Sequence, residues 1–415
     1  MQNKVVSRAP IYDSNLSDAR GNEKDEAPLS KKLRTSRDPG EALQAPFRSP
    51  QLPAELWSLI FTNVEDRHTI HSASLVCRVA HREADAFLYR DIIFKRWRNR
   101  YIATVHRALK ASPRRQNMVR RLAIRSANGH IEEQAVTMLV EILLMVPNLI
   151  MLELAVFKPA NLAILDPLLG QLASVCPFRL LVFLTDAPFE TDIVGFYAQQ
   201  QELIFLSWDI MHTTTRPPPA IPPTALNNLR FLRCETGIRP FVQSARSITH
   251  LEIGHLLQWQ INQILELLSD QLVSFKIAER RNAQYTPLSP ALVFRHGIPR
   301  GLKYLELREV DEFQSAPRPP KFTTLDSSDV LPFSEPGLSL ETFVWQAMWM
   351  CPSDFRHPEI RCFAEDVSEA CHSLRDFVFF SDKDEPMSYK LLEGELVGNK
   401  EPVEFPHDMY TWCKV

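Results

Sequence analysis

Residues 119–124, VRRLAI, and residues 149–154, LIMLEL, carry the pattern that decides the fold. Each stretch has apolar side chains at its first, fourth and sixth positions and variable residues between them. In an extended strand successive side chains point to opposite faces, so the fourth and sixth positions point to the same side. Each stretch therefore predicts a short strand with one buried face.

The same pattern occurs ten times between residues 119 and 379, at intervals of 19 to 38 residues. The fourth positions of the copies are Leu122, Leu152, Leu181, Leu206, Leu232, Leu251, Phe275, Leu305, Phe343 and Phe377. Segments of helical character lie between several copies, most clearly at 131–145, 160–176, 191–200 and 256–268. A strand and a helix per repeat predict an α/β fold, a solenoid with a parallel sheet along its concave face.

Upstream of the repeats, residues 52–90 have the pattern of three short helices. Pro53 suits a first helical position. Leu56, Leu59 and Ile60 then recur at helical spacing, and Asp66 or Ser72 can cap a second helix. The second helix is expected to include Ala73, Val76, Cys77 and Ala80, and the third to span 81–90. Three such helices bury little surface, so we expect some apolar faces to pack on another chain or on the following domain.

This segment opens with Leu-Pro-x-Glu-Leu, continues with Ser-Leu-Val-Cys-Arg and closes with Leu-Tyr-Arg at Leu88, Tyr89 and Arg90. That order resembles the F-box, the helical module by which a substrate receptor binds the Skp-type adaptor of a cullin-RING ubiquitin ligase. Shortly after the Cys-Arg pair, Val79, Ala80 and His81 stand where the family often has Trp. The residues that the resemblance implies for adaptor binding are Leu52, Pro53, Glu55, Leu56, Ile60, Phe61, Leu75, Val76, Cys77 and Arg78. It further implies a cullin scaffold reached through the adaptor, and a target protein bound by the solenoid.

Residues 118–380 in turn resemble the irregular leucine-rich-repeat domains that follow F-boxes. A regular repeat of that family places Asn or Cys three residues after its last leucine, where this chain has Phe157, Leu256 and Val310. We therefore expect a distorted arc without an asparagine ladder. The proline-rich segments 216–223 and 311–338 are expected to form long loops.

Composition, the repeats and the two resemblances together divide the 415 residues into five parts. We expect a disordered, charged tail at 1–49, an F-box-like helical domain at 50–94, a basic helical linker at 95–118, the solenoid at 119–385 and a tail or cap at 386–415. No long apolar run precedes residue 50, and the seven cysteines are scattered along the chain. These features favour a reducing compartment, the cytoplasm or the nucleus.

Residues 90–121 carry eleven Lys or Arg and one acid, Asp91. With Trp97 and Tyr101 interleaved, the stretch could contact nucleic acid or a phosphorylated peptide. The apolar Ile92, Ile93, Ile102, Val105 and Leu109 instead favour an amphipathic connecting helix with a solvated cationic face. We prefer the helix.

Nothing in the sequence indicates catalysis or a cofactor, since phosphate-binding loops and hydrolase motifs are absent. Cys77 lies among apolar neighbours at helical spacing, as structural cysteines commonly do. Cys351, His357, Cys362, Cys371 and His372 fit no common zinc spacing, so no metal site is expected. Three functions remain open: a ubiquitin-ligase substrate receptor, a repeat scaffold outside any ligase, and a nucleic-acid-associated protein.

Overall fold

The computed structural model describes residues 52–64, 66–94, 99–125, 133–155, 168–187, 191–208, 220–222, 224–234, 240–241, 247–254, 258–280, 288–295, 297–310, 327–346, 357–380, 387–392 and 395–399. The chain forms two compact units, a helical unit that ends at Phe87 and a solenoid that begins at Leu88. The predicted disordered tail at 1–49 and all but residues 220–222 of the predicted loop at 216–223 lie outside the described residues.

Three helices form the helical unit: α1 (Ala54–Asn63), α2 (Arg67–Ser74) and α3 (Arg78–Arg90), of which the last continues into the solenoid. Pro53 is the N-cap of α1, one position before the predicted one. Asp66 caps α2, because its carboxylate accepts hydrogen bonds from the N–H groups of His68 and Thr69 at 3.2 and 2.8 Å. Asp66 is therefore the cap, and the alternative, Ser72, lies inside α2.

The predicted second helix is wrong in one respect, since α2 ends at Ser74 and α3 begins only at Arg78. The Ser74 hydroxyl donates back to the carbonyl of His71 at 2.6 Å. Cys77 precedes α3, and its Sγ accepts the N–H of Ala80 at 3.4 Å. Such local side-chain bonds compete with a continuous helix. They explain why a prediction from helical spacing alone extended the second helix through the turn.

A sheet of thirteen strands, arranged in chain order, forms the described part of the solenoid. Strands β1 to β11 pair in parallel, and the last two pairs are antiparallel. The parallel strands are β1 (Asp91–Phe94), β2 (Arg121–Arg125), β3 (Met151–Ala155), β4 (Val182–Thr185), β5 (Phe205–Trp208), β6 (Phe231–Cys234), β7 (His250–Gly254), β8 (Ser274–Arg280), β9 (Tyr304–Val310), β10 (Thr342–Gln346) and β11 (Asp376–Phe380). This arrangement confirms the predicted α/β solenoid with a parallel sheet.

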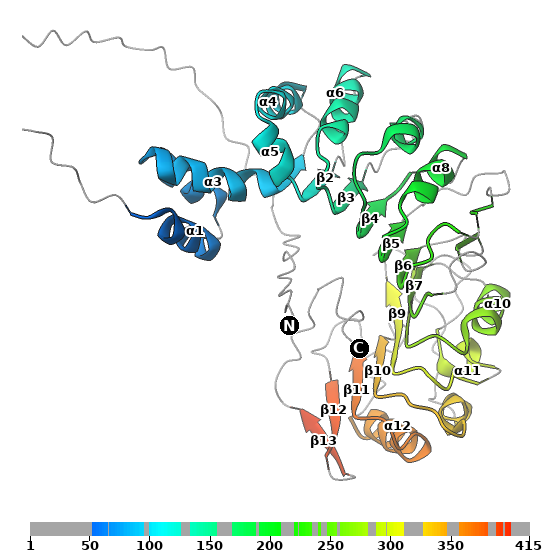
Figure 1. Cartoon of the computed structure of the whole chain (residues 1–415). Helices are drawn as coiled ribbons and strands as arrows, with labels where there is room; N and C mark the ends of the chain where they lie inside the picture. Colours follow the sequence, from blue (N-terminus) through cyan, green and yellow to red (C-terminus); the bar gives the residue numbers. More distant parts are fainter. Residues whose placement is uncertain are drawn as a thin grey trace, which may run out of the picture. The chain divides into compact units, whose positions relative to one another are not determined.

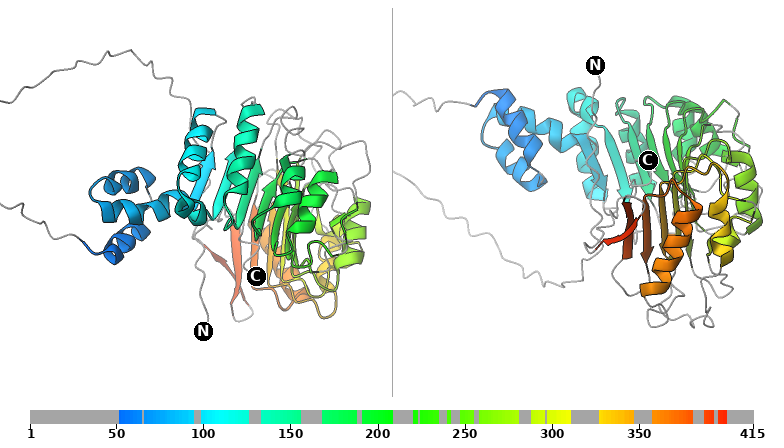
Figure 2. Two further views of the ribbon diagram at one scale, coloured as in Figure 1. Left: turned by 45° about the horizontal axis from the view of Figure 1, so that its top comes forward. Right: turned by 90° about the horizontal axis from the view of Figure 1, so that it is seen from below.

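Within the solenoid the strands follow an arc and the helices lie along its outer side (Figures 1 and 2). The helices are α4 (Asn99–Lys110), α5 (Pro113–Met118), α6 (Glu133–Leu144), α8 (Thr191–Gln199), α10 (Gln258–Leu268), α11 (Pro290–Val293), α12 (His357–Ala370) and a helix at 168–175. All four predicted helical intervals contain one of them. Among the described ranges no helix is long and apolar enough to cross a membrane.

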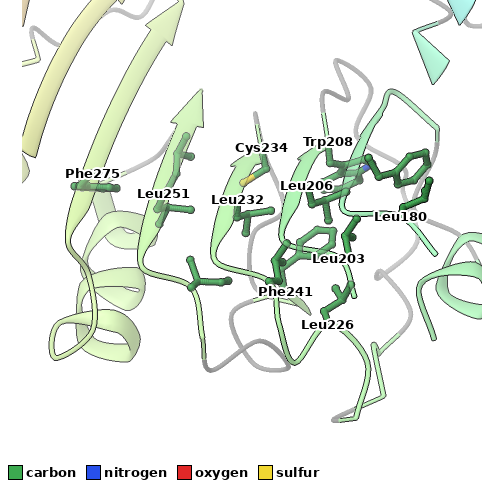
Figure 3. Close-up of a cluster of buried hydrophobic side chains, with 14 of the residues drawn as sticks. Leu180, Leu203, Leu206, Trp208, Leu226, Leu232, Cys234, Phe241, Leu251 and Phe275 are labelled. Carbon is green, nitrogen blue, oxygen red and sulfur yellow. The ribbon is translucent and has the colours of Figure 1, made fainter. Parts of the chain in front are cut away.

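The repeated apolar positions build one continuous core between the sheet and the helices. Leu206, Leu232, Leu251 and Phe275 are register partners on β5 to β8 and lie side by side in the core (Figure 3). All four are fully buried. Burying one such side chain contributes about 1.5–3 kcal/mol, so the stacking of repeats is the main source of stability.

One of the ten predicted copies is out of register. The sequence pattern places Leu181 at the fourth position, but Leu152 of β3 pairs with Phe183 of β4. The first, fourth and sixth positions of this copy are therefore Leu180, Phe183 and Thr185, all buried. A polar sixth position is tolerated because the Thr185 hydroxyl accepts the N–H of Ala187 at 3.0 Å.

An eleventh copy stands before the ten that the sequence predicts. Residues 91–94, predicted to be helical, form β1, in which Ile92 pairs with Leu122. Tyr89, Ile92 and Phe94 occupy the first, fourth and sixth positions and contribute to the core. The solenoid therefore begins before residue 119, and the predicted linker at 95–118 contributes its first helices, α4 and α5, of which α4 packs on α6.

A repeated hydrogen bond ties together the turns that lead into the strands. The donor is the Asn or Ser side chain just before the first apolar residue of a repeat, and the acceptor is a turn carbonyl of the preceding repeat. The pairs are Asn148 with Asn117 (3.0 Å), Asn228 with Gln201 (2.8 Å), Ser247 with Asn227 (2.8 Å) and Ser373 with Leu338 (3.1 Å). These bonds satisfy backbone groups that would otherwise lie unpaired at the edge of the solenoid.

Two tryptophans bond the loops at the other end of the strands. Trp208 and Trp345 occupy sixth positions, and their indole N–H groups donate to the carbonyls of Ala187 and Leu288 at 2.9 and 3.0 Å. These indole groups form hydrogen bonds with the loop backbone, as the Asn side chain does in a regular repeat. Of the residues expected to interrupt an asparagine ladder, Val310 ends β9, and Phe157 and Leu256 lie outside the described residues.

The C-terminal segment predicted as a tail or cap contains a hairpin, β12 (Met387–Leu392) and β13 (Glu395–Asn399). It continues the sheet beyond β11 in antiparallel fashion. The predicted loop at 311–338 contains two short 3-10 helices, η1 (Ser327–Asp329) and η2 (Leu331–Ser334), and Phe333 of η2 is fully buried.

Candidate interaction site

The residues predicted to bind an adaptor gather on α1 and on the turn between α2 and α3. Six large apolar side chains of this region are exposed, although each of them could stabilise the fold by burial. Their exposed fractions are 42% for Leu52, 44% for Leu56, 59% for Leu59, 40% for Ile60, 73% for Leu75 and 70% for Val76. We call these six residues the apolar surface of the helical unit.

The apolar surface contains one residue outside the set that the F-box resemblance implies. Leu59 follows Leu56 by one turn of α1 and is even more exposed. The helical spacing of Leu56, Leu59 and Ile60 in the sequence already places Leu59 on the same face as the other two. Pro53, Glu55 and Arg78 are also exposed.

Phe61 departs from the predicted set, because only 1% of it is exposed. Its ring stacks on Trp57, with centroids 5.6 Å apart, and packs against Phe87 at 5.8 Å. Phe61 is thus a core residue of the helical unit rather than part of a contact surface. Its position on α1, one residue after Ile60, turns it inward while Ile60 faces outward.

Cys77 is half-buried. Its Sγ accepts the Ala80 N–H, and its carbonyl accepts the N–H of His81 at 2.9 Å. The residue therefore anchors the first turn of α3 and orients the turn that presents Leu75 and Val76.

The inner face of the solenoid sheet carries a series of ion pairs across β6 to β9. Glu252 lies 3.5 Å from Arg233 Nε and 3.6 Å from Lys276 Nζ, and Lys276 reaches Glu306 at 3.4 Å. Tyr304 donates its hydroxyl to Glu306 at 2.7 Å. Burial and, next, the Glu306 carboxylate raise the pKa of Tyr304 well above its ordinary value, so the hydroxyl keeps its proton.

A second ionic group lies on β2 and β3. Glu153 accepts both Nε and Nη2 of Arg125, and Arg121 Nη2 lies 3.4 Å from it. Charged groups desolvated in this way keep the face polar, and they are suited to orient a partner more than to stabilise the fold.

The basic stretch at 90–121 contributes to the solenoid. Ile102 and Leu109 of α4 are buried, as the amphipathic interpretation predicts. The guanidinium of Arg115 lies 4.8 Å above the ring of Tyr89, and Arg120 donates to the carbonyl of Asn148 at 3.0 Å. Trp97, the aromatic residue on which nucleic-acid binding partly depended, lies outside the described residues.

The cysteines and histidines near the C-terminus are only partly described. Cys371 is buried, with its Sγ 3.3 Å from the Ser373 hydroxyl, whereas Cys362 and His372 are exposed. Cys351 lies outside the described residues. In the part of the chain that the structure covers, no three His, Cys, Asp or Glu side chains gather as metal ligands would.

Comparisons with known proteins find likenesses in structure and none in sequence. No family model matches the chain, and no curated protein matches its sequence. Among solved structures the chain is similar to TLR13 in its complex with ssRNA13, with 13% sequence identity and a TM-score of 0.36. The alignment covers 66% of this chain and 34% of that one, so the chain spans about a third of the length of TLR13. The fold assignment therefore rests on the sheet topology itself.

Proposed function

We propose that this protein is the substrate receptor of an SCF-type cullin-RING ubiquitin ligase. In this proposal the helical unit binds a Skp-type adaptor, the adaptor connects to a cullin scaffold, and the solenoid holds a target protein. The observation that carries it is the apolar surface of the helical unit, because five of its six residues belong to the set that the F-box resemblance implies for adaptor binding.

Exposure of these side chains on the helical unit favours a partner. A unit without a partner would gain stability by turning its large apolar residues into its own core. Six of them instead remain exposed within 25 residues of sequence, from Leu52 to Val76. Apolar groups gathered in this way typically mark a protein–protein interface.

The chain itself is proposed to be non-catalytic and free of cofactors. Its contribution would be to hold a target near the reacting groups of the ligase, which raises their effective concentration. A repeat scaffold outside any ligase is the alternative, and it differs in leaving the apolar surface without an adaptor.

A pull-down with purified adaptor tests the proposal. The triple variant Leu56→Ser, Leu75→Ser, Val76→Ser removes exposed side chains only, so the helical unit should stay folded. Leu267→Ser and Leu331→Ser remove side chains of comparable exposure from the solenoid and serve as controls. We expect the controls to retain adaptor and the triple variant to lose it. Equal recovery of adaptor with all variants, or none with the wild type, would exclude the proposed function.

A further inference from the structure

The edge of the sheet at which the strands begin carries a row of side chains that the sequence keeps far apart. The residue after the first apolar position of each repeat donates its N–H to the carbonyl of its counterpart in the preceding repeat. The successive N···O distances are 2.8 Å for Arg120 to Arg90, 2.9 Å for Ile150 to Arg120, 2.9 Å for Leu181 to Ile150, 3.0 Å for Ile204 to Leu181 and 3.0 Å for Arg230 to Ile204. We call these six residues the strand-start row.

The strand-start row is apolar in its centre and basic at both ends. Ile150 is exposed, and Leu181 and Ile204 are half-buried. Arg90 and Arg230 are exposed and have no ion-pair or hydrogen-bond partner for their side chains within the described structure. Such an arrangement leaves positive charge available on either side of an aliphatic strip.

The apolar centre continues onto the inner face of the sheet. Val182 and Leu184 of β4 and Phe231 of β6 pack against Phe205 of β5 on this face, apart from the main core. Phe205 and Phe231 stack with centroids 6.3 Å apart. The aliphatic strip is thus the margin of a wider apolar surface on β4 to β6.

The far end of the same edge is built differently. There Glu341 lies 3.3 Å from Lys303 Nζ and 3.8 Å from Arg375 Nη1, so both cations share an acidic partner within the chain. No ion pair of this kind involves Arg90, Arg120 or Arg230 among the described residues. Glu202, an exposed acid in the turn before β5, forms none with them either. The arginines that flank the apolar strip therefore differ from the far end in having no acidic partner within the described residues.

We propose that the strand-start row from Arg90 to Arg230, with the apolar surface beside it, is where the solenoid binds its target. The target presents a segment with aliphatic residues in the middle and acidic residues on both sides. This inference rests on the proposed function for its biological meaning, since it assigns the target-binding surface of the receptor. Complementary charge fixes the register of the segment, and the apolar centre supplies affinity.

The spacing of the arginines sets the length of the segment. Arg120 and Arg230 are four strand intervals apart, about 19 Å at a strand separation of about 4.8 Å. An extended chain covers that distance with about six residues. The acidic groups of the target should therefore be separated by about six positions.

Fluorescence anisotropy with a labelled peptide tests the inference on the full chain. The probe has Asp-Glu at one end, Glu-Asp at the other and Leu-Ile-Gly-Leu-Ile between them, and the comparison peptide has Lys-Arg and Arg-Lys ends instead. We expect the wild type to bind the acidic peptide more tightly at low salt than at high salt, and to discriminate against the basic one. The double variant Arg90→Glu, Arg230→Glu should bind the acidic peptide at least about tenfold more weakly and should prefer the basic peptide.

Arg100→Glu, Arg107→Glu is the matched control, because both arginines are exposed on α4, their guanidinium groups have no partner in the described structure, and they lie outside the row. An equal loss of affinity with this control would overturn the inference. The inference would also be overturned if the wild-type protein did not bind the acidic peptide, or if it bound both peptides with equal affinity. The adaptor pull-down is a separate readout: the row variants should retain adaptor, and the Leu56, Leu75, Val76 variant should retain peptide, so failure of either proposal is visible by itself.

Discussion

Phe61 and Asp66 stabilise the helical unit by different means. Phe61 fills the space between Trp57 and Phe87, whereas Asp66 satisfies backbone N–H groups at the start of α2. Replacing Phe61 by Ala should therefore lower the free energy of unfolding of this unit by about 3–5 kcal/mol. Hydrogen–deuterium exchange of the α1 to α3 peptides at increasing urea concentration measures this, with Leu59→Ala as the exposed control. A loss for Phe61→Ala no larger than that of the control would contradict the assignment of Phe61 to the core.

Asp66 gives the helical unit a pH dependence. The hydrogen bond from the Thr69 hydroxyl, followed by the backbone bonds of Thr69 and His68, lowers the pKa of Asp66 below its ordinary 3.8. Because the pKa in the folded state is the lower one, the stabilisation is complete above the ordinary value and disappears as the pH falls through the depressed one. The thermal midpoint of wild type should thus exceed that of Asp66→Ala at neutral pH, and the gap should shrink in acid. A gap that is independent of pH would refute this role.

At the scale of the element, the turns before the strands depend on side-chain bonds between neighbouring repeats. Asn228→Ala and Ser247→Ala each remove one such side-chain donor. Each should lower the free energy of unfolding by about 0.5–1.5 kcal/mol. Ser269→Ala is a suitable control, because the Ser269 hydroxyl makes no hydrogen bond in the described structure. Thermal denaturation should rank both variants below this control, and equal midpoints for all three would show that the inter-repeat bonds contribute nothing.

Most strands could be predicted from the sequence because their alternate side chains enter one core. The exceptions have local causes. Leu181 and Phe183 both fit the fourth position, and the observed register places a polar Thr185 at the sixth position, which the pattern disfavours. Tyr89, Ile92 and Phe94 fit it too, but their residues overlap the end of the F-box resemblance. The apolar surface of the helical unit was largely predictable, since it is one stretch of sequence. The strand-start row was not, because it joins residues from six repeats and requires the register.

For the whole molecule, the position of β1 decides where the chain can be divided. A fragment starting at Leu88 keeps β1 on the edge of β2, whereas one starting at residue 95 exposes that edge and loses the core contacts of Ile92 and Phe94. We expect the first fragment to unfold cooperatively near the midpoint of the full chain and the second at a lower temperature, as differential scanning calorimetry can determine. Equal midpoints for the two fragments would show that β1 does not contribute to the solenoid core.

In the proposed function each unit binds a different partner: the helical unit binds the adaptor, and the solenoid binds the target. Hydrogen–deuterium exchange of the full chain, measured by mass spectrometry with and without a Skp-type adaptor, tests this division most directly. The account predicts slower exchange in peptides covering residues 52–78 and unchanged exchange from β2 to β11. Unchanged exchange in residues 52–78 at saturating adaptor, or protection confined to the solenoid, would contradict it.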